Sequence, residues 1–384
     1  MANKIWHPDD LNSAQWFIAG SKIRGLDWIP NVTPKPGSPE FLNLPESMKR
    51  ILRLDNPDLI ATIERRGVDV PVVSIEITTT TPQSQHAKQR VPRLVAAAEA
   101  DVPSVYIIPG RKKSGGSTYS LTRDLYYGID MIRLINTVPV FIYTYPDKNG
   151  SLLRDINYPN QPDLKHPETI TAFQTIDKIM EYRLDDKQIQ DLNSDPWISQ
   201  EIKRQSDLGT SAAVAIENYD TLTQIETCEL KAFLEKNTRI RPNIIRQTLS
   251  RLPRRITNRD KTLIFRPRGR MFAHAGDPYC GMLAFFDYAF CRTGRSVENR
   301  KMNLVYMPAG KSVSFITREF CRAGYYKYWS KDCPFRNDDV PSIDDQFTIS
   351  HHLQYGCVFT KIKPLRIYGY FSDMIIFRDA ILVF

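Results

Sequence analysis

The sequence predicts an α/β fold of the α+β kind, in which helices flank a mixed β-sheet and a second α+β domain follows. Two neighbouring runs, residues 58–64 and 71–80, alternate apolar and polar side chains as half-buried strands do. A helical segment separates them from a third apolar run, residues 104–109, which favours parallel pairing. With 384 residues, of which 42% are hydrophobic, the chain can bury the cores of two or three domains.

The elements of the first domain are predicted from their boundary residues. Residues 1–35 hold scattered Trp and Pro residues, and we expect an irregular cap with one short helix. Pro45 and Glu46 favour the start of a helix over residues 44–54, and the following Asp55-Asn56-Pro57 ends it. The strands at 58–64 and 71–80 form a hairpin. Further elements are helices at 82–100 and 122–136 and strands at 104–109 and 138–145.

The sequence predicts two domains. Residues 1–200 form the first, with its core at about 44–145, and residues 201–384 form the second. A stretch rich in Pro, Asn and Asp at 146–167 is expected to be a long loop. Later helices are expected at 168–184, 196–207, 223–236 and 243–252, and later strands at 303–307, 313–317, 358–362 and 375–377.

Composition restricts the class of protein. The formal net charge is +9, which favours a polyanionic partner. No apolar run approaches the roughly 18 residues of a membrane span, so we expect no membrane partner. The N-terminus lacks the apolar stretch of a secretory signal. The six cysteines are dispersed without a CxxC pair, which fits free thiols and a cytoplasmic location.

Two acids, Asp58 and Glu76, lie in the neighbouring predicted strands. Hydrolysis of a phosphodiester needs an activated water, charge neutralisation at the phosphate and help for the leaving oxygen. Mg²⁺ supplies all three when carboxylates hold it and leave positions open. Asp58 and Glu76 are therefore candidate ligands, and the backbone carbonyl of Ile77 is a third. Strand alternation puts Thr78 on the same face as Glu76.

Pro57-Asp58, a gap of seventeen residues and then Glu76-Ile77-Thr78 resemble the motif of the PD-(D/E)XK nuclease superfamily, which includes many type II restriction endonucleases. The predicted order helix, strand, strand, helix, strand over residues 44–110 is similar to that family's restriction endonuclease-like core. The resemblance implies Mg²⁺-dependent hydrolysis with one or two ions per site, with Mn²⁺ able to substitute. It also implies that Asp58 and Glu76 are metal ligands. Glu46, in the helix that precedes them, would be an additional acid that helps to bind the metal.

The chain departs from the family at Thr78, where the family has a lysine that polarises the attacking water. Lys88, in the next predicted helix, could reach back to supply the charge, and we favour it. Gln89 is the second choice for orienting the water. Gln83 and Gln85 are further alternatives.

The charge is concentrated between Arg239 and Arg270, where eleven Lys or Arg residues stand against one acid, Asp260. The predicted helix at 243–252 has arginines beside an apolar stripe, and with the preceding helix it could form a helix–turn–helix. The basic, glycine-containing loop at 111–116 could touch a DNA backbone. The nucleic-acid-binding candidates are Lys112, Lys113, Arg241, Arg246, Arg251, Arg254, Arg255, Arg266, Arg268 and Arg270.

Other patterns are weaker. Residues 325–329 (Tyr-Tyr-Lys-Tyr-Trp) could stack bases or form a small core. No GxxxxGK[ST] motif is present, which argues against a nucleotide-hydrolysing motor. The spacing of His and Cys residues around residues 274–280 and 351–352 does not favour zinc. A Cys–His dyad of His274 with Cys280 or Cys291 lacks a local consensus.

Together these features predict a Mg²⁺-dependent endodeoxyribonuclease that cuts double-stranded DNA, of the type II-like, site-specific restriction class. Cutting both strands needs two active sites, so we expect a homodimer. One alternative is a repair, mobile-element or RNA-directed nuclease with the same core. Another, favoured by Thr78, is a non-catalytic DNA-binding protein on a degenerate nuclease fold.

Overall fold

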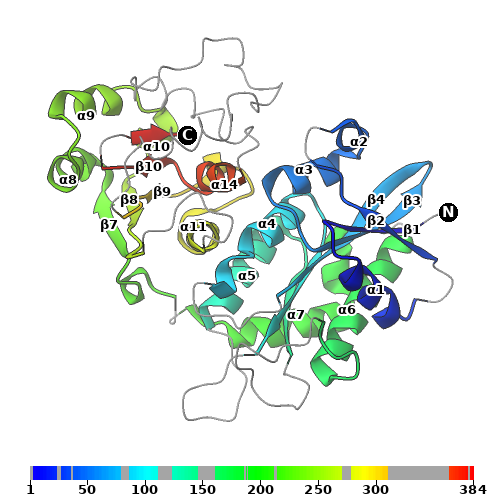
Figure 1. The fold of residues 1–384 in the computed structure, drawn as a ribbon. Coiled ribbons are helices and arrows are strands. Elements are labelled where there is room, and N and C mark those ends of the chain that lie inside the picture. Colours follow the sequence, from blue (N-terminus) through cyan, green and yellow to red (C-terminus); the bar gives the residue numbers. More distant parts are fainter. Residues whose placement is uncertain are drawn as a thin grey trace. The chain divides into compact units, whose positions relative to one another are not determined.

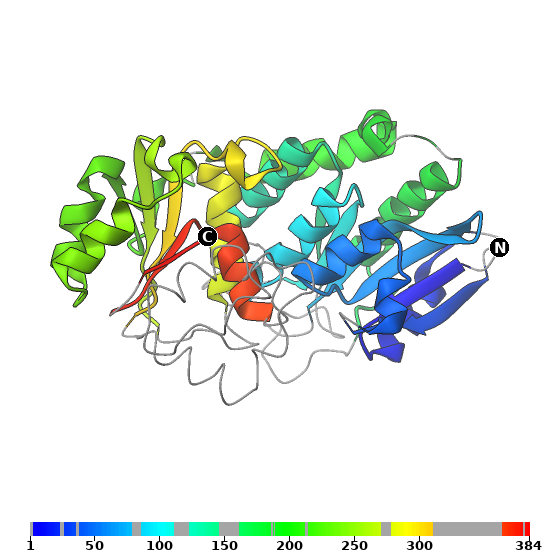
Figure 2. The same ribbon diagram turned by 90° about the horizontal axis from the view of Figure 1, so that it is seen from above.

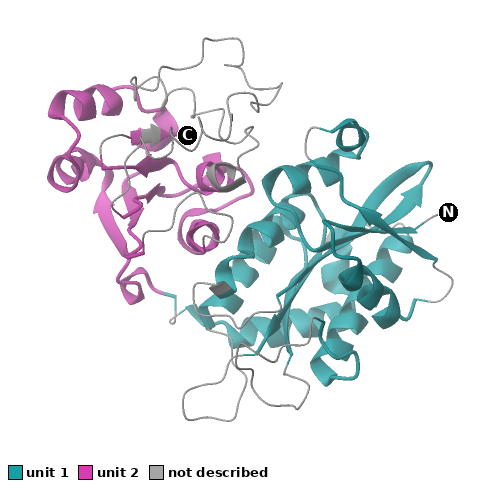
Figure 3. Cartoon of the chain, viewed as in Figure 1, with its two compact units in different colours: residues 1–214 teal, residues 215–384 magenta. Residues whose placement is uncertain are grey.

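A computed structural model of the chain has mixed α/β architecture (Figure 1) and divides into two compact units, residues 1–214 and 215–384 (Figure 3). The division comes fourteen residues after the boundary expected at residue 200. The structure describes residues 3–23, 27–35, 38–78, 86–110, 123–145, 161–185, 187, 189–211, 214–269, 278–309, 363–378 and 381–384.

The first unit is built on a six-stranded sheet. Its central hairpin is antiparallel, and the strands that follow the hairpin pair in parallel, as the helical crossovers predict. The sheet is therefore mixed. In spatial order its strands are β2 (Trp28–Val32), β1 (Asn3–His7), β3 (Leu59–Arg65), β4 (Val68–Ile77), β5 (Ser104–Pro109) and β6 (Val140–Tyr145).

The N-terminal segment contains the short helix expected from the sequence, but the rest of it is not the irregular cap that was predicted. β1 and β2 pair in parallel, and helix α1 (Leu11–Gly20) connects them. β1 also pairs antiparallel with β3, so the segment extends the sheet. The misleading signal was Pro30, which lies within β2. A proline is tolerated there because β2 is the last strand in the sheet order, where a missing N–H breaks no ladder.

The β3–β4 hairpin brings Asp58 and Glu76 together. Its turn is Arg66-Gly67, with φ of 53° and 79°, the left-handed conformation that two-residue hairpin turns need. At the other end of the hairpin Leu59 pairs with Ile75. Extending this register by one residue puts Asp58 opposite Glu76, and residues directly opposite in an antiparallel pair have neighbouring side chains.

Helices cover both faces of this sheet, as predicted (Figures 1 and 2). Three of them share one face, and Arg50 of the first donates a hydrogen bond to the carbonyl of Glu99 at the end of the second. On the other face, Trp16 of α1 packs against Phe173, with ring centroids 4.9 Å apart. The first group is α3 (Glu46–Leu54), α4 (Val91–Glu99) and α5 (Arg123–Asn136). Beyond α1, the remaining helices are α6 (Pro167–Leu184), α7 (Pro196–Leu208) beside β6, and the short α2 (Pro39–Leu42).

The helix expected from residue 82 begins later than predicted. The described chain resumes at a 3₁₀ turn, η1 (His86–Lys88), and α4 starts at Val91. Pro92 lies in the first turn of α4, where a proline costs no hydrogen bond. All nine residues of α4 are buried, so the helix is held tightly against its surroundings.

The second unit is also α+β, with a five-stranded mixed sheet. Its central strands are parallel and both edge strands are antiparallel. Strand alternation separates two apolar faces. Ile264 and Val305 point towards Leu234 and Ile245, while Phe265 and Tyr306 pack against Phe286 and Tyr368. The order is β11 (Ile381–Val383), β10 (Met374–Ile376), β9 (Asn303–Tyr306), β8 (Lys261–Phe265) and β7 (Leu222–Glu226).

Two expectations for this unit were wrong. The helix expected at 223–236 starts as strand β7 and becomes helical only after a 3₁₀ turn, because Leu222–Glu226 pairs with β8. The basic segment 239–270, expected to be surface, contains β8, an inner strand of the sheet next to the edge strand β7. The strands expected at 313–317 and 358–362 lie outside the described residues. The helices are α8 (Leu230–Asn237), α9 (Pro242–Leu249), α10 (Arg254–Thr257), α11 (Tyr279–Phe286) and α14 (Lys363–Phe371).

Short helical turns complete the description. Residues Asp287–Cys291 form a π-helix, η6, at the end of α11. In the described ranges, no helix has the length and apolar character needed to cross a membrane. The 3₁₀ turns other than η1 are η2 (Ile189–Ser194), η4 (Ile216–Asn218), η5 (Thr227–Glu229) and η7 (Val297–Asn299).

Candidate active site

The carboxyl groups of Asp58 and Glu76 lie together at the open end of the β3–β4 hairpin. The main-chain N–H of Asp58 donates to Oε2 of Glu76 at 3.2 Å, and the N–H of Ile77 donates to Oδ2 of Asp58 at 2.8 Å. Each carboxylate thus accepts a backbone hydrogen bond from the strand that carries the other. These bonds hold both acids at fixed positions next to each other.

The two acids differ in their access to solvent. The Glu76 side chain is 1% exposed, whereas that of Asp58 is 22% exposed. Glu76 lies at the inner end of the pair and Asp58 at its outer end. A molecule arriving from solvent would therefore meet Asp58 first.

A guanidinium group lies between the acids. Nη1 of Arg93, from α4, is 2.9 Å from Oδ1 of Asp58 and 2.6 Å from both carboxylate oxygens of Glu76. Nε of the same side chain is 3.4 Å from Oδ1 of Asp55, which follows α3. Arg93 is buried. One arginine therefore links three acids from two different parts of the chain.

A second arginine reaches the pair from the position directly before α4. Nε of Arg90 is 3.0 Å from Oε1 of Glu76. Arg90 caps the N-terminus of α4 and Arg93 follows it by three residues, and both side chains reach Glu76. The Arg90 side chain is 30% exposed, so it extends from buried Glu76 to the surface.

The electrostatics of the cluster are dominated by burial. Desolvation raises the pKa of Glu76 to about 8; Arg93 and Arg90 oppose this increase, and the charge of Asp58 adds to it. Burial lowers the pKa of Arg93, but the charges of Glu76, Asp55 and Asp58 outweigh it and raise this pKa well above its ordinary value. Arg93 therefore keeps its positive charge, and Glu76 holds a proton more tightly than an exposed glutamate does.

Thr78, which stands at the position of the family's lysine, is part of a packed polar contact. Its hydroxyl lies 3.1 Å from the hydroxyl of Tyr106, and its carbonyl accepts a hydrogen bond from Tyr145 at 2.8 Å. The Tyr106 hydroxyl also donates to the carbonyl of Ala87, at 3.2 Å. Thr78 is 7% exposed. Its neighbours leave little room for a longer side chain at this position.

Lys88, the residue favoured to replace that lysine, binds a different acid. Its Nζ lies 2.6 Å from Oδ2 of Asp124 on α5, and its side chain is 3% exposed. Gln89 is half-buried in the turn between η1 and α4. Gln83 and Gln85 lie outside the described residues. A catalytic role for Lys88 or Gln89 stays a prediction. Arg90 and Arg93 are the cations that the structure brings to Glu76.

Glu46, the proposed helix acid, lies at the opposite end of α3 from Asp55. It is exposed and pairs with Lys49 at 3.4 Å and Arg53 at 3.1 Å. The acid that α3 brings to the cluster is instead Asp55, at its C-terminal end. Sequence reasoning missed Asp55 and both arginines, although Asp55 lies three residues before Asp58 and the arginine spacing matches one helical turn.

The donors at this site fit a hard divalent cation by type. Carboxylate oxygens of Asp58 and Glu76 and the carbonyl of Ile77 are ligands of the kind that Mg²⁺ prefers. Across the described ranges, however, no group of three or more His, Cys, Asp and Glu side chains is arranged to hold a metal ion. The cation found between the two acids is Nη1 of Arg93.

The nucleic-acid-binding candidates of the second unit divide by exposure. Ile245 is buried on α9 while Arg246 is exposed, as the amphipathic pattern predicts. Arg255 is half-buried, 3.9 Å from Glu298, and Arg268 pairs with Asp220 at 2.5 Å. Lys112, Lys113 and Arg270 lie outside the described residues. The exposed candidates are Arg241, Arg246, Arg251, Arg254, Arg266 and Arg268.

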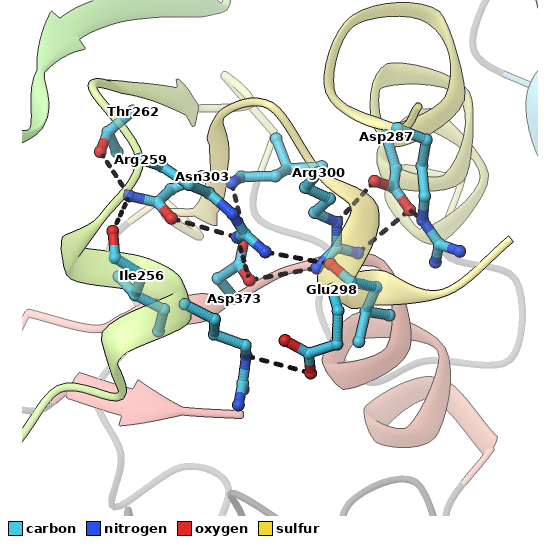
Figure 4. Close-up of polar contacts among 12 residues, drawn as sticks. Ile256, Arg259, Thr262, Asp287, Glu298, Arg300, Asn303 and Asp373 are labelled. Atoms are coloured by element: carbon cyan, nitrogen blue, oxygen red, sulfur yellow. Dashed lines mark hydrogen bonds and ion pairs between the residues drawn. The ribbon is translucent and has the colours of Figure 1, made fainter. Parts of the chain in front are cut away.

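Arg259, counted with the basic surface segment, is buried and belongs to an internal network (Figure 4). It donates to Asp373 at 2.8 Å and to Asn303 at 3.1 Å. Arg300 joins Asp373 to Asp287, donating to them at 3.2 Å and 2.7 Å. Arg259 therefore holds the sheet and its helices together and cannot contact a ligand outside.

Comparisons with protein-family models, with curated proteins and with solved structures find no match to this chain. The resemblance to the PD-(D/E)XK superfamily thus stays a prediction carried by Pro57-Asp58 and Glu76-Ile77-Thr78.

Proposed function

We propose that this protein is a metal-dependent endodeoxyribonuclease that hydrolyses phosphodiester bonds in double-stranded DNA, of the type II-like restriction class. The observation that carries the proposal is the pairing of Asp58 and Glu76. Their oxygens converge on one cationic atom from adjacent strands, within 2.6–2.9 Å. Paired carboxylates open to solvent on one side are what metal-assisted phosphodiester hydrolysis requires.

In this proposal Asp58 and Glu76 would hold Mg²⁺ or Mn²⁺, with the carbonyl of Ile77 as a further ligand. The ion would activate a water and neutralise charge on the phosphate. The backbone hydrogen bonds between the two strands keep the acids in place before anything binds. Arg90, with its partly exposed guanidinium, would attract the phosphate to the outer side of the pair.

The second unit would supply the contacts that hold DNA. Its exposed arginines on and around α9 and α10, including Arg241, Arg246 and Arg254, are suited to phosphate contacts. Cutting both strands requires two active sites, which supports a homodimer on DNA. Equilibrium sedimentation with a duplex oligonucleotide would test that assembly, because a 1:1 complex of protein and duplex argues against it.

Plasmid digestion tests the proposed activity. Discrete products with Mg²⁺ that disappear with EDTA are expected, and Asp58→Ala and Glu76→Ala should each abolish cutting while DNA still binds. Asp69→Asn is the matched control, because Asp69 lies on the same hairpin at its other end and pairs with Lys4. Full activity of both Ala variants would exclude this pair as the active site.

A non-catalytic DNA-binding protein on a degenerate nuclease fold is the second candidate. Two observations favour it: Thr78 stands where the family has a lysine, and Arg93 lies between the two acids. In the same experiment this candidate gives gel shifts without cleavage at any Mg²⁺ or Mn²⁺ concentration.

A further inference from the structure

We infer that Arg93 is the resident cation of the Asp58–Glu76 pair: it holds both carboxylates in register without metal, gives up that position when metal binds, and then contacts the substrate phosphate. The inference rests on the proposed nuclease function and deepens it. It assigns to Arg93 the positive charge that the chain lacks at Thr78.

The contact geometry makes Arg93 and a metal ion competitors. A single atom, Nη1, lies within 2.6–2.9 Å of three oxygens belonging to both acids. Mg²⁺ binds oxygens at about 2.0–2.1 Å, so an ion held by the same oxygens would need the place that Nη1 takes. The two cations therefore exclude each other at this point.

Arg93 can leave that place without leaving the site. Its Nε already lies 3.4 Å from Oδ1 of Asp55, a third acid of the cluster. Asp55 is buried, so its carboxylate can still bind the Arg93 guanidinium inside the protein. Because a guanidinium has five N–H donors in a planar fork, it can keep Asp55 and turn the others to a phosphate.

The charges of the cluster support the same sequence of contacts. With the carboxylates deprotonated, as metal binding requires, Asp55, Asp58 and Glu76 together with Arg90 and Arg93 leave one negative charge. Adding a divalent cation changes this to one positive charge. That matches the single negative charge of a phosphodiester, so both arginines become useful to the substrate only in the metal-loaded site.

The test compares Mn²⁺ affinity without DNA and cleavage with DNA for the wild type and three variants. Arg93→Gln keeps the length of a polar side chain but removes the charge. Arg93→Lys keeps the charge but loses the planar set of N–H donors of the guanidinium. The control is Arg133→Gln. Arg133, like Arg93, pairs with an acid, but this acid is Asp130 of its own helix, at 2.5 Å. Mn²⁺ binding is followed by calorimetry and by electron paramagnetic resonance.

For Arg93→Gln we expect Mn²⁺ binding tightened by about tenfold, within the range by which residues around a site alter metal affinity. Cleavage at saturating Mn²⁺ should fall by about 100-fold, the cost of losing one charged donor to the transition state. Arg93→Lys should lie between the wild type and Arg93→Gln in both measurements. If Arg93→Gln does not fold, Arg93→Lys serves as the test: its Mn²⁺ binding should be tighter and its cleavage slower than those of the wild type.

Mn²⁺ binding that is unchanged or weaker in the Arg93 variants overturns the inference, as does undiminished cleavage. A wild type that binds no Mn²⁺ and cuts no DNA instead refutes the nuclease proposal, and the inference with it. The two failures are distinguishable because the first leaves wild-type cleavage intact.

Discussion

Asp58 and Glu76 are joined by a backbone hydrogen bond as well as by their shared contact with Arg93: the N–H of Asp58 donates to Oε2 of Glu76 at 3.2 Å, at the end of the hairpin where their strands open. The N–H of Ile77 returns the contact to Asp58 at 2.8 Å. The register of β3 and β4 fixes this pairing. The two carboxylates are therefore held side by side by hydrogen bonds from the main chain of both strands.

The first prediction concerns pH. Because burial raises the pKa of Glu76 to about 8, the folded protein holds a proton that the unfolded chain releases near its ordinary value of 4.5. Stability contributed by this group is therefore complete below pH 4.5 and is lost as pH rises towards about 8. Urea denaturation of the metal-free protein at pH 6 and pH 8.5 measures the loss.

Glu76→Gln is the control for that measurement, because a glutamine has no proton to release. Its free energy of unfolding should change less between the two pH values than that of the wild type. A pH dependence equal to that of the wild type would assign the loss to other groups. The carboxyl carbon shift of Glu76 in a ¹³C NMR titration reports its protonation directly.

The second prediction concerns Thr78. Thr78→Lys should destabilise the protein by about 1–3 kcal/mol, because a longer side chain must displace the contact with Tyr106. Thr78→Ser keeps the hydroxyl and should cost less. Thermal unfolding measures both. If Thr78→Lys is as stable as the wild type and cuts DNA faster, the packing explanation for the absent lysine is wrong.

The third prediction concerns the buried network of the second unit. Asp373 accepts hydrogen bonds from Arg259, Arg300 and the N–H of Leu304. Asp373→Ala leaves two arginines without this buried partner and should cost about 3–5 kcal/mol in the free energy of unfolding. Asp220→Asn, which removes an exposed partner of Arg268, should change it by less than about 0.5 kcal/mol. Similar losses in both variants would contradict the role given to the network.

The fourth prediction concerns DNA contact. Arg241→Ala, Arg246→Ala and Arg254→Ala should each weaken binding to all sequences alike and lower the salt dependence, log K against log salt, by about one. Lys187→Ala is the control, because Lys187 is exposed in the first unit and pairs with Asp185. Fluorescence anisotropy over a range of salt concentrations measures the slope. An unchanged slope removes these arginines from the interface.

Much of the fold could be predicted because local patterns agree with the tertiary structure. The alternation in residues 58–64 and 71–80 specifies the hairpin, and the helical crossover to residues 104–109 specifies parallel pairing. The N-terminal strands escaped prediction because they are short and β2 contains Pro30. β7 was taken for helix because five residues are too few to separate the two periods.

The acids of the candidate site were also within reach of sequence reasoning, since the register of a hairpin determines which residues face each other. Their partners were not. Arg93 reaches Asp58 and Glu76 only because α4 packs against the sheet, which is a tertiary contact. Similarly, Lys88 is adjacent to the site in sequence but is held by Asp124, thirty-six residues later in the chain. Arg259 was misplaced for the same reason, because its burial depends on Asp373, 114 residues away.

A crystal structure of the protein with a duplex oligonucleotide and Ca²⁺ tests the central claim most directly, because Ca²⁺ takes oxygen ligands as Mg²⁺ does. The account predicts a cation bound by Asp58 and Glu76 next to a backbone phosphate, with Arg93 moved from between the acids. Density for Nη1 of Arg93 still between the two carboxylates, with DNA bound and no cation there, would contradict it.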